Sequence, residues 1–313
     1  MIIRKIIQRN FGKFFRKTAT KEAVVLQEKL EGGKFALLAE FDPPKGTDTS
    51  GMLSAAGRIK GQVDALVVSE MNNAVMRQSA LGSSILLRQK GHEVIMQICC
   101  RDRNRLALQG DLLSAASLGI DNLMLVQGDP PGYGDHPDTM AVDDLDLAGL
   151  QEAVDRMHAG RDLAGAELSG TPSFFVGQPL DIGTEPDQMD RVKHAVQNGL
   201  EQGAKYFVTR PVFDPSLLDA LQQATAPLTG YIIPSILLLK SVGMARYIDM
   251  NIQNISLPAE LITRLKKSPD KAAEGMKIAA EGVQAARERG FGGALLSTMG
   301  WEHRLPEIIH HIK

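Results

Sequence analysis

The sequence predicts a single (β/α)8 barrel, an α/β fold of the TIM type, and three observations lead to this fold class. Eight short apolar runs recur along the chain of 313 residues, and each is nearly continuous, as in parallel strands buried on both faces. Segments with helical spacing of apolar residues lie between the runs. No Gly-x-Gly-x-x-Gly follows the first run, and a doubly wound sheet, the alternative, usually has fewer strands.

The predicted strands are rich in Val, Ile, Leu and Phe, and most of them end at a polar residue, a glycine or a proline. They cover residues 35–42, 65–70, 93–100, 122–129, 173–181, 206–214, 230–238 and 293–300.

Helix-like segments precede four of these strands, at residues 83–91, 104–119, 188–203 and 271–290. Their last residues are Gly91, Gly119, Gly203 and Gly290, in the position after a helix end that glycine favours. The long polar segment 132–170 is interpreted as the fourth strand-to-helix loop and its helix. No linker rich in Pro, Gly or Ser divides the chain, so residues 35–313 are predicted to form one catalytic domain.

Residues 1–34 are predicted to be a basic helical extension of the barrel. The first 21 residues contain seven Lys or Arg and no acidic residue, with apolar residues at amphipathic spacing. A transit peptide, a membrane-surface helix, a partner-docking helix and an extra helix that packs on the fold all fit this pattern.

Composition excludes several classes of protein. The net charge of −2 provides no general attraction to nucleic acid. The two cysteines, Cys99 and Cys100, are adjacent, which excludes a disulfide framework, a thiolate zinc site and an iron–sulfur cluster, so no metal site is expected. No apolar run approaches the roughly 18 residues of a membrane span. These features predict a cytoplasmic protein.

Carboxylates stand at the carboxyl ends of two predicted strands. In a barrel these ends form the floor of the active site. Glu40 and Asp42 end the first strand and Asp129 ends the fourth, and a Pro-Pro pair follows in both cases. Because proline fixes φ and lacks an N–H, the chain must leave the rim abruptly, which holds each carboxylate on stiff backbone at the mouth.

At these strand ends the chain resembles the methylenetetrahydrofolate reductases. That family ends its first strand in Glu-Phe-x-Pro-Pro, its fourth in Gly-Asp-Pro, and its sixth in Thr-Gln before an aromatic residue and Asp. The corresponding residues here are Glu40 to Pro44, Gly128 to Pro130, and Thr209-Arg210 before Phe213-Asp214. The segments CRDRN (100–104), LKSVGMARY (239–247) and GWEHRLPEI (300–308) are similar to the short, acetogen-type members.

The resemblance implies flavin-dependent interconversion of 5,10-methylenetetrahydrofolate and 5-methyltetrahydrofolate, with hydride transfer through flavin N5. The cofactor is expected to be FAD, with FMN as the alternative. Glu40 is the implied general acid for N10 of the folate, a role that requires a raised pKa. Asp129 is the implied carboxylate beside the flavin, where it favours hydride donation and stabilises the iminium that forms when the folate ring opens.

The same resemblance predicts the binding residues. Expected at the cofactor are Ser69, Gln97, Gln127, Asp129, Ala141, Gln178, Lys193 and His194, and expected at the substrate are Glu40, Asp129, Arg210, Ser241 and Trp301. The only tryptophan, Trp301, is either a platform for the p-aminobenzoate ring or a residue at the edge of the core.

Several positions depart from the family. It often has His at Gln97, Arg at Gln127 and Gln at Arg210, and its basic pair for the flavin diphosphate aligns with Asn198-Gly199. Arg191, Lys193 and His194 lie one to two turns earlier, where they either substitute for that pair or form a solvated helix face. Because an unpaired guanidinium beside a developing cation is unfavourable, we expect a carboxylate, Asp42, Glu40 or Asp129, to neutralise Arg210.

The electron donor is expected to be NADH or a partner electron-transfer subunit, and the oligomeric state remains open between a homo-oligomer and a hetero-complex. Two other functions compete with the reductase. One is a partner-dependent or non-catalytic folate- or flavin-binding barrel subunit, which the departures favour. The other is a pterin-binding methyltransferase barrel, which Glu40 and Asp129 argue against.

Overall fold

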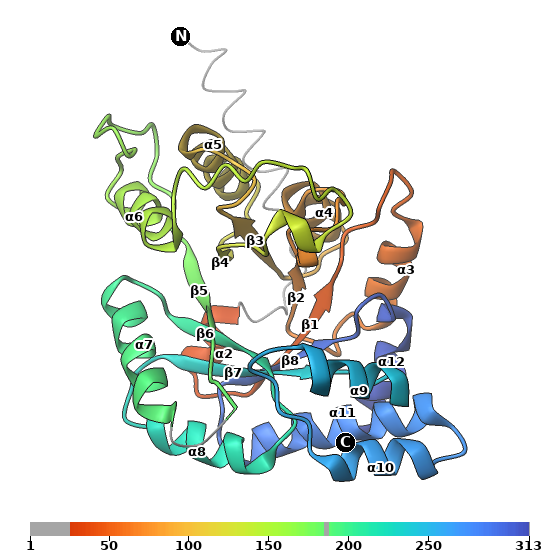
Figure 1. The fold of residues 1–313 in the computed structure, drawn as a ribbon. Helices are drawn as coiled ribbons and strands as arrows, with labels where there is room; N and C mark the ends of the chain where they lie inside the picture. Colours follow the sequence, from red (N-terminus) through yellow and green to blue (C-terminus); the bar gives the residue numbers. More distant parts are fainter. Residues whose placement is uncertain (1–25, 185–187, 313) are drawn as a thin grey trace.

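Eight parallel strands close into a barrel in which every strand pairs with its neighbours in sequence order, and β1 pairs with β8 (Figure 1). This closed parallel barrel confirms the predicted fold class. The computed structural model describes residues 26–184 and 188–312. The strands are β1 (Ala36–Phe41), β2 (Ala65–Val68), β3 (Val94–Cys99), β4 (Asn122–Val126), β5 (Phe175–Leu180), β6 (Tyr206–Pro211), β7 (Tyr231–Leu237) and β8 (Gly293–Ser297).

Helices surround the barrel, and the connection between β7 and β8 contains three of them, α9, α10 and α11 (Figure 1). The helices are α2 (Leu26–Glu31), α3 (Ser50–Arg58), α4 (Ala80–Gln89), α5 (Arg105–Ser117), α6 (Leu147–His158), α7 (Met189–Glu201), α8 (Pro215–Thr225), α9 (Val242–Asn251), α10 (Ala259–Lys267), α11 (Lys271–Glu288) and α12 (Leu305–His311). Short 3-10 turns η1 (Asn72–Ala74), η2 (Pro131–Tyr133) and η4 (Glu302–Arg304) lie in the loops.

Each predicted strand coincides with an observed one, and each predicted helix overlaps α4, α5, α7 or α11. Gly91, Gly119, Gly203 and Gly290 follow these helices with φ of 78°, 73°, 98° and 74°, so the glycine end signals are confirmed. The segment 132–170 contains α6, as predicted.

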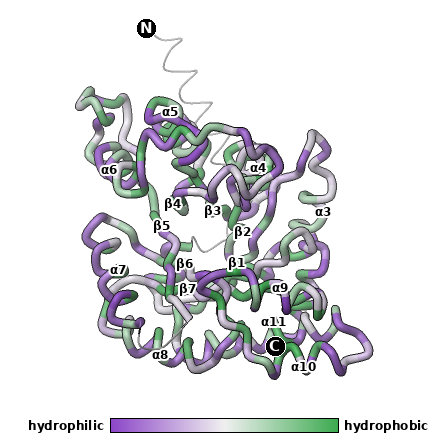
Figure 2. The backbone as a smooth tube through the Cα atoms, in the orientation of Figure 1, coloured by the Kyte–Doolittle hydropathy of each residue, from purple (hydrophilic) through white to green (hydrophobic). Residues whose placement is uncertain are grey.

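The helix α2 packs against the end of the barrel opposite the mouth. Its Leu26 and Leu30 are buried, and they join Ala36, Leu38 and Ala65 in the cluster of residues that fills the barrel interior. A larger cluster lies between the strands and the surrounding helices, and a smaller one joins the end of β7 to α9, α10 and α11. Hydrophilic residues are prominent in the outer helices and loops (Figure 2). Residues 1–25 lie outside the described residues, so most of the predicted basic extension stays a prediction.

Tyr206 fills much of the barrel interior. It is fully buried, its ring stacks on Phe175 with centroids 5.3 Å apart, and its hydroxyl donates to the carbonyl oxygen of Leu123 at 2.7 Å. The ring lies directly against Gly177 of β5, where a Cβ would come within 2.1 Å of a ring carbon. The interior therefore requires glycine at this position because an aromatic ring occupies the space of a side chain.

We expect Gly177→Ala to lower the free energy of unfolding by roughly 1–3 kcal/mol, the usual range for an overpacked core. The free energy of unfolding is measured by chemical denaturation, and the m-value should not change. The matched control is Gly57→Ala in α3, where a Cβ meets no atom within 4 Å and the change should be neutral or stabilising. A Gly177→Ala protein as stable as wild type would mean that Tyr206 does not occupy the barrel interior.

Candidate functional site

The carboxyl ends of the strands bring polar side chains together at the mouth of the barrel. Side chains alternate along a strand, so Glu40 of β1, Ser69 after β2, Gln97 of β3 and Ser297 of β8 share the interior face with the buried apolar residues below them. This alternation, together with the position at the strand ends, makes the mouth the candidate site.

Glu40 is half-buried at the mouth. Its Oε1 accepts a hydrogen bond from Asn72 Nδ2 at 3.0 Å, and its Oε2 accepts one from the Ser297 hydroxyl. Burial raises the pKa of Glu40; the bonds from Ser297 and Asn72 lower it, and the nearby charge of Asp42 raises it. The net shift is upward, which is the condition for a carboxyl group that holds its proton at higher pH than usual.

Asp42 lies beside Glu40 and is held as an acceptor. Its Oδ1 accepts from the Ser69 hydroxyl at 2.6 Å and from Asn72 Nδ2 at 3.3 Å, and its Oδ2 lies 3.9 Å from Arg77 Nη2. Ser69 is completely buried. Ser69, which the sequence analysis predicted at the cofactor, therefore orients the carboxylate of Asp42 at the mouth.

The loop between β2 and α4 links the two predicted catalytic carboxylates. Asn72 donates to Glu40, and the backbone N–H of the next residue, Asn73, donates to Asp129 Oδ2 at 2.9 Å. Two consecutive residues of one turn thus contact both carboxylates, which places Glu40 and Asp129 at the same site.

The Gly128-Asp129 turn after β4 packs on the CRDRN segment. Gly128 has φ of +94°, and a Cβ there would lie 2.5 Å from Cys99 Sγ and 3.0 Å from Arg101 Cβ. Arg101 is 4% exposed; it donates to the Asp129 carbonyl oxygen at 2.9 Å and binds Asp102 with two further bonds. The close packing explains the glycine, and it leaves the Asp129 side chain exposed at the rim.

A second carboxylate, Glu70, is buried beside the site but already paired. It accepts from Arg103 at 3.2 Å and from the backbone N–H of Ala80 at the start of α4 at 2.8 Å. Burial raises the pKa of Glu70, and the charge of Arg103 opposes this shift. Its contacts assign it to support of α4 and of the CRDRN segment.

The other residues predicted at the cofactor fall in three places. Gln97 is buried and accepts a hydrogen bond from the Glu70 N–H at 3.1 Å. Gln127 is exposed at the rim and donates to Asp143 at 2.9 Å. Ala141 is exposed in the β4–α6 loop. On α7, Lys193 is half-buried and His194 is exposed. Gln178 points out of the barrel, where its amide donates to Gln151 of α6 at 3.1 Å. The structure therefore brings Ser69, Gln97, Gln127 and Asp129 to the mouth but not Gln178.

Arg210 of β6 is exposed. Among the described residues, no carboxylate lies at salt-bridge distance from its guanidinium, and Asp42 is paired with Arg77 instead. The expectation that Asp42, Glu40 or Asp129 neutralises Arg210 is thus wrong for the described part of the chain. Exposure explains the difference, because a solvated guanidinium needs no partner to offset burial.

Ser241 and Trp301 flank the mouth on the β7 and β8 side. The Ser241 hydroxyl accepts from the Met244 N–H at 3.1 Å and caps α9. Trp301 is half-buried against the outer core, and Lys240 Nζ lies 5.1 Å from its ring centroid. One face of the indole is therefore covered by a cation.

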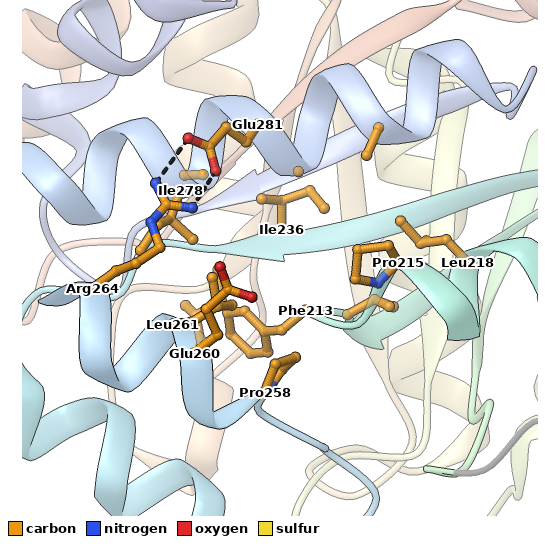
Figure 3. Close-up of a pocket in the computed structure, with 15 residues that line it drawn as sticks. Phe213, Pro215, Leu218, Ile236, Pro258, Glu260, Leu261, Arg264, Ile278 and Glu281 are labelled. Atoms are coloured by element: carbon orange, nitrogen blue, oxygen red, sulfur yellow. Dashed lines mark hydrogen bonds and ion pairs between the residues drawn. The ribbon is translucent and has the colours of Figure 1, made fainter.

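A separate cavity of about 290 Å³ lies outside the barrel, between α8, α10 and α11 (Figure 3). Its lining is largely apolar, and its Arg264 is paired with Glu281 at 2.7 Å and with Glu274 at 2.8 Å. Because its lining is largely apolar and the polar strand-end side chains gather at the mouth instead, we assign the chemistry to the mouth.

Comparison with known proteins decides the family. A family model described as "Methylenetetrahydrofolate reductase" matches residues 25–313. The chain belongs to the methylenetetrahydrofolate reductase family. The resemblance inferred from the sequence is confirmed, and membership supports a folate-related function. No curated protein matches the sequence.

Two solved structures illustrate the fold of this reductase family member. An uncharacterised Clostridium thermocellum protein, reported to bind two copies of 5-methyl-5,6,7,8-tetrahydrofolic acid, is 14% identical with a TM-score of 0.61, covering 92% of this chain and 98% of its own. The EDTA monooxygenase EmoA of Chelativorans sp. BNC1 is 10% identical with a TM-score of 0.51, covering 89% and 93%. At these identities the similarity extends to the fold alone.

The described residues also limit the classes of site. No group of three or more His, Cys, Asp or Glu side chains among them is arranged to hold a metal ion. None of the helices within 26–184 and 188–312 is both long and apolar enough to cross a membrane.

Several residues of this site were not given a role from the sequence. They are Asn72, Asn73, Arg77, Arg101 and Ser297. The pair Asn72-Asn73 directly after a strand is a detectable signal, because asparagine tolerates left-handed backbone better than other non-glycine residues. Ser297 was visible as a polar residue at a strand end, but its partner Glu40 is 257 positions away in sequence.

Proposed function

We propose that this protein is a flavin-dependent methylenetetrahydrofolate reductase that interconverts 5,10-methylenetetrahydrofolate and 5-methyltetrahydrofolate. The observation that carries the proposal is the pairing of a half-buried carboxyl, Glu40, with an exposed carboxylate, Asp129, by consecutive residues of one loop in a barrel of this family. Different surroundings give two carboxyl groups different roles, and burial raises the pKa of Glu40.

The residues at the rim fit a flavin. Gln127 offers an amide and Asp129 an acceptor in exposed positions, and Lys193 with His194 of α7 provides cationic or polar groups for phosphate. Lys193 is half-buried and His194 exposed on α7, and we propose that they face the phosphate groups of the flavin. FAD is the cofactor we propose, with FMN as the alternative; when bound, it supplies the hydride.

The role of Glu40 is to deliver a proton to N10 of the folate as the methylene bridge opens. Its half-buried position raises the pKa of the carboxyl, which favours the protonated form that a general acid needs. The role of Asp129 is electrostatic. Its charge at the rim stabilises the positive charge that develops on the substrate as the ring opens. The Clostridium thermocellum barrel binds a ligand of the class we propose here.

The test is anaerobic reduction of the flavin-loaded protein by 5-methyltetrahydrofolate. We expect the long-wavelength flavin band to bleach and 5,10-methylenetetrahydrofolate to form in equal amount. Binding of flavin without bleaching would favour a non-catalytic binding subunit. Transfer of the methyl group to a thiol or corrinoid in the absence of flavin would favour a methyltransferase.

We expect Arg210→Gln to preserve flavin binding and to leave folate turnover equal or higher. The change removes a cation that opposes the positive charge of the opening folate ring, and glutamine offers both a donor and an acceptor. Turnover and flavin affinity at matched ionic strength are the measurements, with Arg58→Gln in the last turn of α3 as the control for loss of one positive charge. A folded, flavin-loaded Arg210→Gln protein without turnover would give Arg210 a required role toward an anionic part of the substrate.

A further inference from the structure

The turn that follows β2 has an unusual backbone. Met71, Asn73 and Ala74 have φ of 48°, 54° and 54°, so three of four consecutive residues adopt the left-handed conformation without being glycine. Such conformations are unfavourable for residues with a Cβ and persist where surrounding contacts hold them.

Contacts from the β4–α6 loop hold this turn. A Cβ on Gly134 would lie 1.8 Å from the Ala74 carbonyl oxygen, so the two backbones are in direct contact. Asp135 accepts from the Met76 N–H at 2.9 Å and pairs with Lys45 of the β1–α3 loop. Three loops of the rim are therefore joined at Asp135.

Because the loop contacts fix this turn, they also fix the direction of the Asn72 side-chain amide. Asn72 Nδ2 carries two hydrogens, and it lies 3.0 Å from Glu40 Oε1 and 3.3 Å from Asp42 Oδ1. Each hydrogen therefore has one carboxylate as its acceptor.

Asp42 decides which way this amide faces. Asp42 is a carboxylate that also accepts from Ser69 and lies beside Arg77, so it requires the donating nitrogen of Asn72 and not its oxygen. The same nitrogen then faces Glu40 Oε1. A proton on Oε1 would meet a donor and not an acceptor, whereas a proton on Oε2 faces the Ser297 hydroxyl, which can accept.

We propose that Asn72 is a positioning residue for Glu40: it keeps Oε1 as an acceptor, so that the proton delivered to the folate is carried on Oε2 beside Ser297. The proposal rests on the function proposed above. It explains why a strained turn is retained at the rim, since a relaxed turn would not direct one amide to two carboxylates.

The proposal also predicts how the acid titrates. The charged groups facing Glu40 are Asp42, directly after its own strand, and Glu302 of η4, and Lys240 and Arg77 lie beyond them. Asn72 and Ser297 are its neutral donors, and both lower the pKa of Glu40. Removing the Asn72 donor should therefore raise the pKa of Glu40, and an acid whose pKa rises loses activity at a higher pH.

The test measures the pKa of Glu40 directly in the full chain without flavin or folate. The protein is labelled at the glutamate carboxyl carbon for NMR titration, and the Glu40 signal is assigned by its loss in Glu40→Gln. We expect Asn72→Ala to raise this pKa by about half a unit to one unit. Asn72→Asp, which keeps the size but replaces the donor with a charge, should raise it further. The alkaline limb of folate turnover should move by the same amount.

Met76→Ala is the control, because it removes an exposed side chain of the same loop and keeps the backbone bond to Asp135. The pKa of Glu40 should not change in it. An unchanged pKa in Asn72→Ala, or a wild-type pKa in Asn72→Asp, would overturn the proposal; if Asn72→Ala does not fold, the isosteric Asn72→Asp decides. Absence of turnover in wild type would overturn the proposed function alone, because the titration needs no ligand.

Discussion

Replacing Glu40 by glutamine is expected to remove folate turnover while the barrel and flavin binding remain. An amide has the size of the carboxyl group and can replace its hydrogen bonds, but it cannot supply a proton to N10. A positioned general acid contributes roughly 10²–10⁴-fold, so a loss in this range is the expected result. Stability at neutral pH should be equal or higher, because the change removes an ionisable group whose charged form is disfavoured by burial.

Three measurements check this prediction. Turnover of methylenetetrahydrofolate should be lost, flavin reduction by an artificial donor should persist, and the wild-type rate should decrease as pH rises through the raised pKa of Glu40, since only the protonated form acts. Glu302→Gln is the matched control, because Glu302 is a half-buried carboxyl nearby that accepts from the Gly300 N–H, and the variant should keep turnover within a few-fold. Glu40→Gln turning over at a rate close to wild type would show that another group is the acid.

Asp129→Asn is expected to raise the midpoint potential of the bound flavin. The substitution removes a negative charge from the rim, and the reduced form of a flavin is commonly anionic. One unit charge a few ångströms away, at an effective dielectric constant of ~20, corresponds to a few kcal/mol before relaxation. The flavin should be reduced more easily and should deliver hydride more slowly, so that the folate half-reaction slows while the first half-reaction does not.

Spectroelectrochemical titration and single-turnover kinetics are the measurements. Asp138→Asn is the control, since Asp138 is an exposed carboxylate of the same β4–α6 loop and should not shift the potential. Because Asn73 donates its backbone N–H to Asp129, an asparagine oxygen can accept the same bond, and the loop should stay in place. A potential equal to or below that of wild type would place Asp129 away from the flavin.

The barrel and the position of two carboxylates at its mouth were predictable from the sequence because their signals are local. Strands buried on both faces appear as continuous apolar runs, and glycine marks the helix ends through its backbone freedom, as Gly91 and Gly119 show. Glu40 and Asp129 could be selected because each stands at a strand end before a Pro-Pro pair, and the family match now covers residues 25–313.

Tertiary structure decided the direction and the partners of the remaining side chains. Gln178 is adjacent to Gly177, which faces the interior, and a displacement by one residue along a strand reverses the face, so Gln178 bonds Gln151 of α6. Arg210 remains solvated because β6 pairs with β5 and β7, whereas Glu40, Asp42 and Asp129 stand at the ends of β1 and β4. The roles of Asn72 and Ser297 depend on contacts between distant parts of the chain. No local pattern encodes such contacts, because they arise only when the barrel closes and brings β1, β8 and the β2–α4 loop to one mouth.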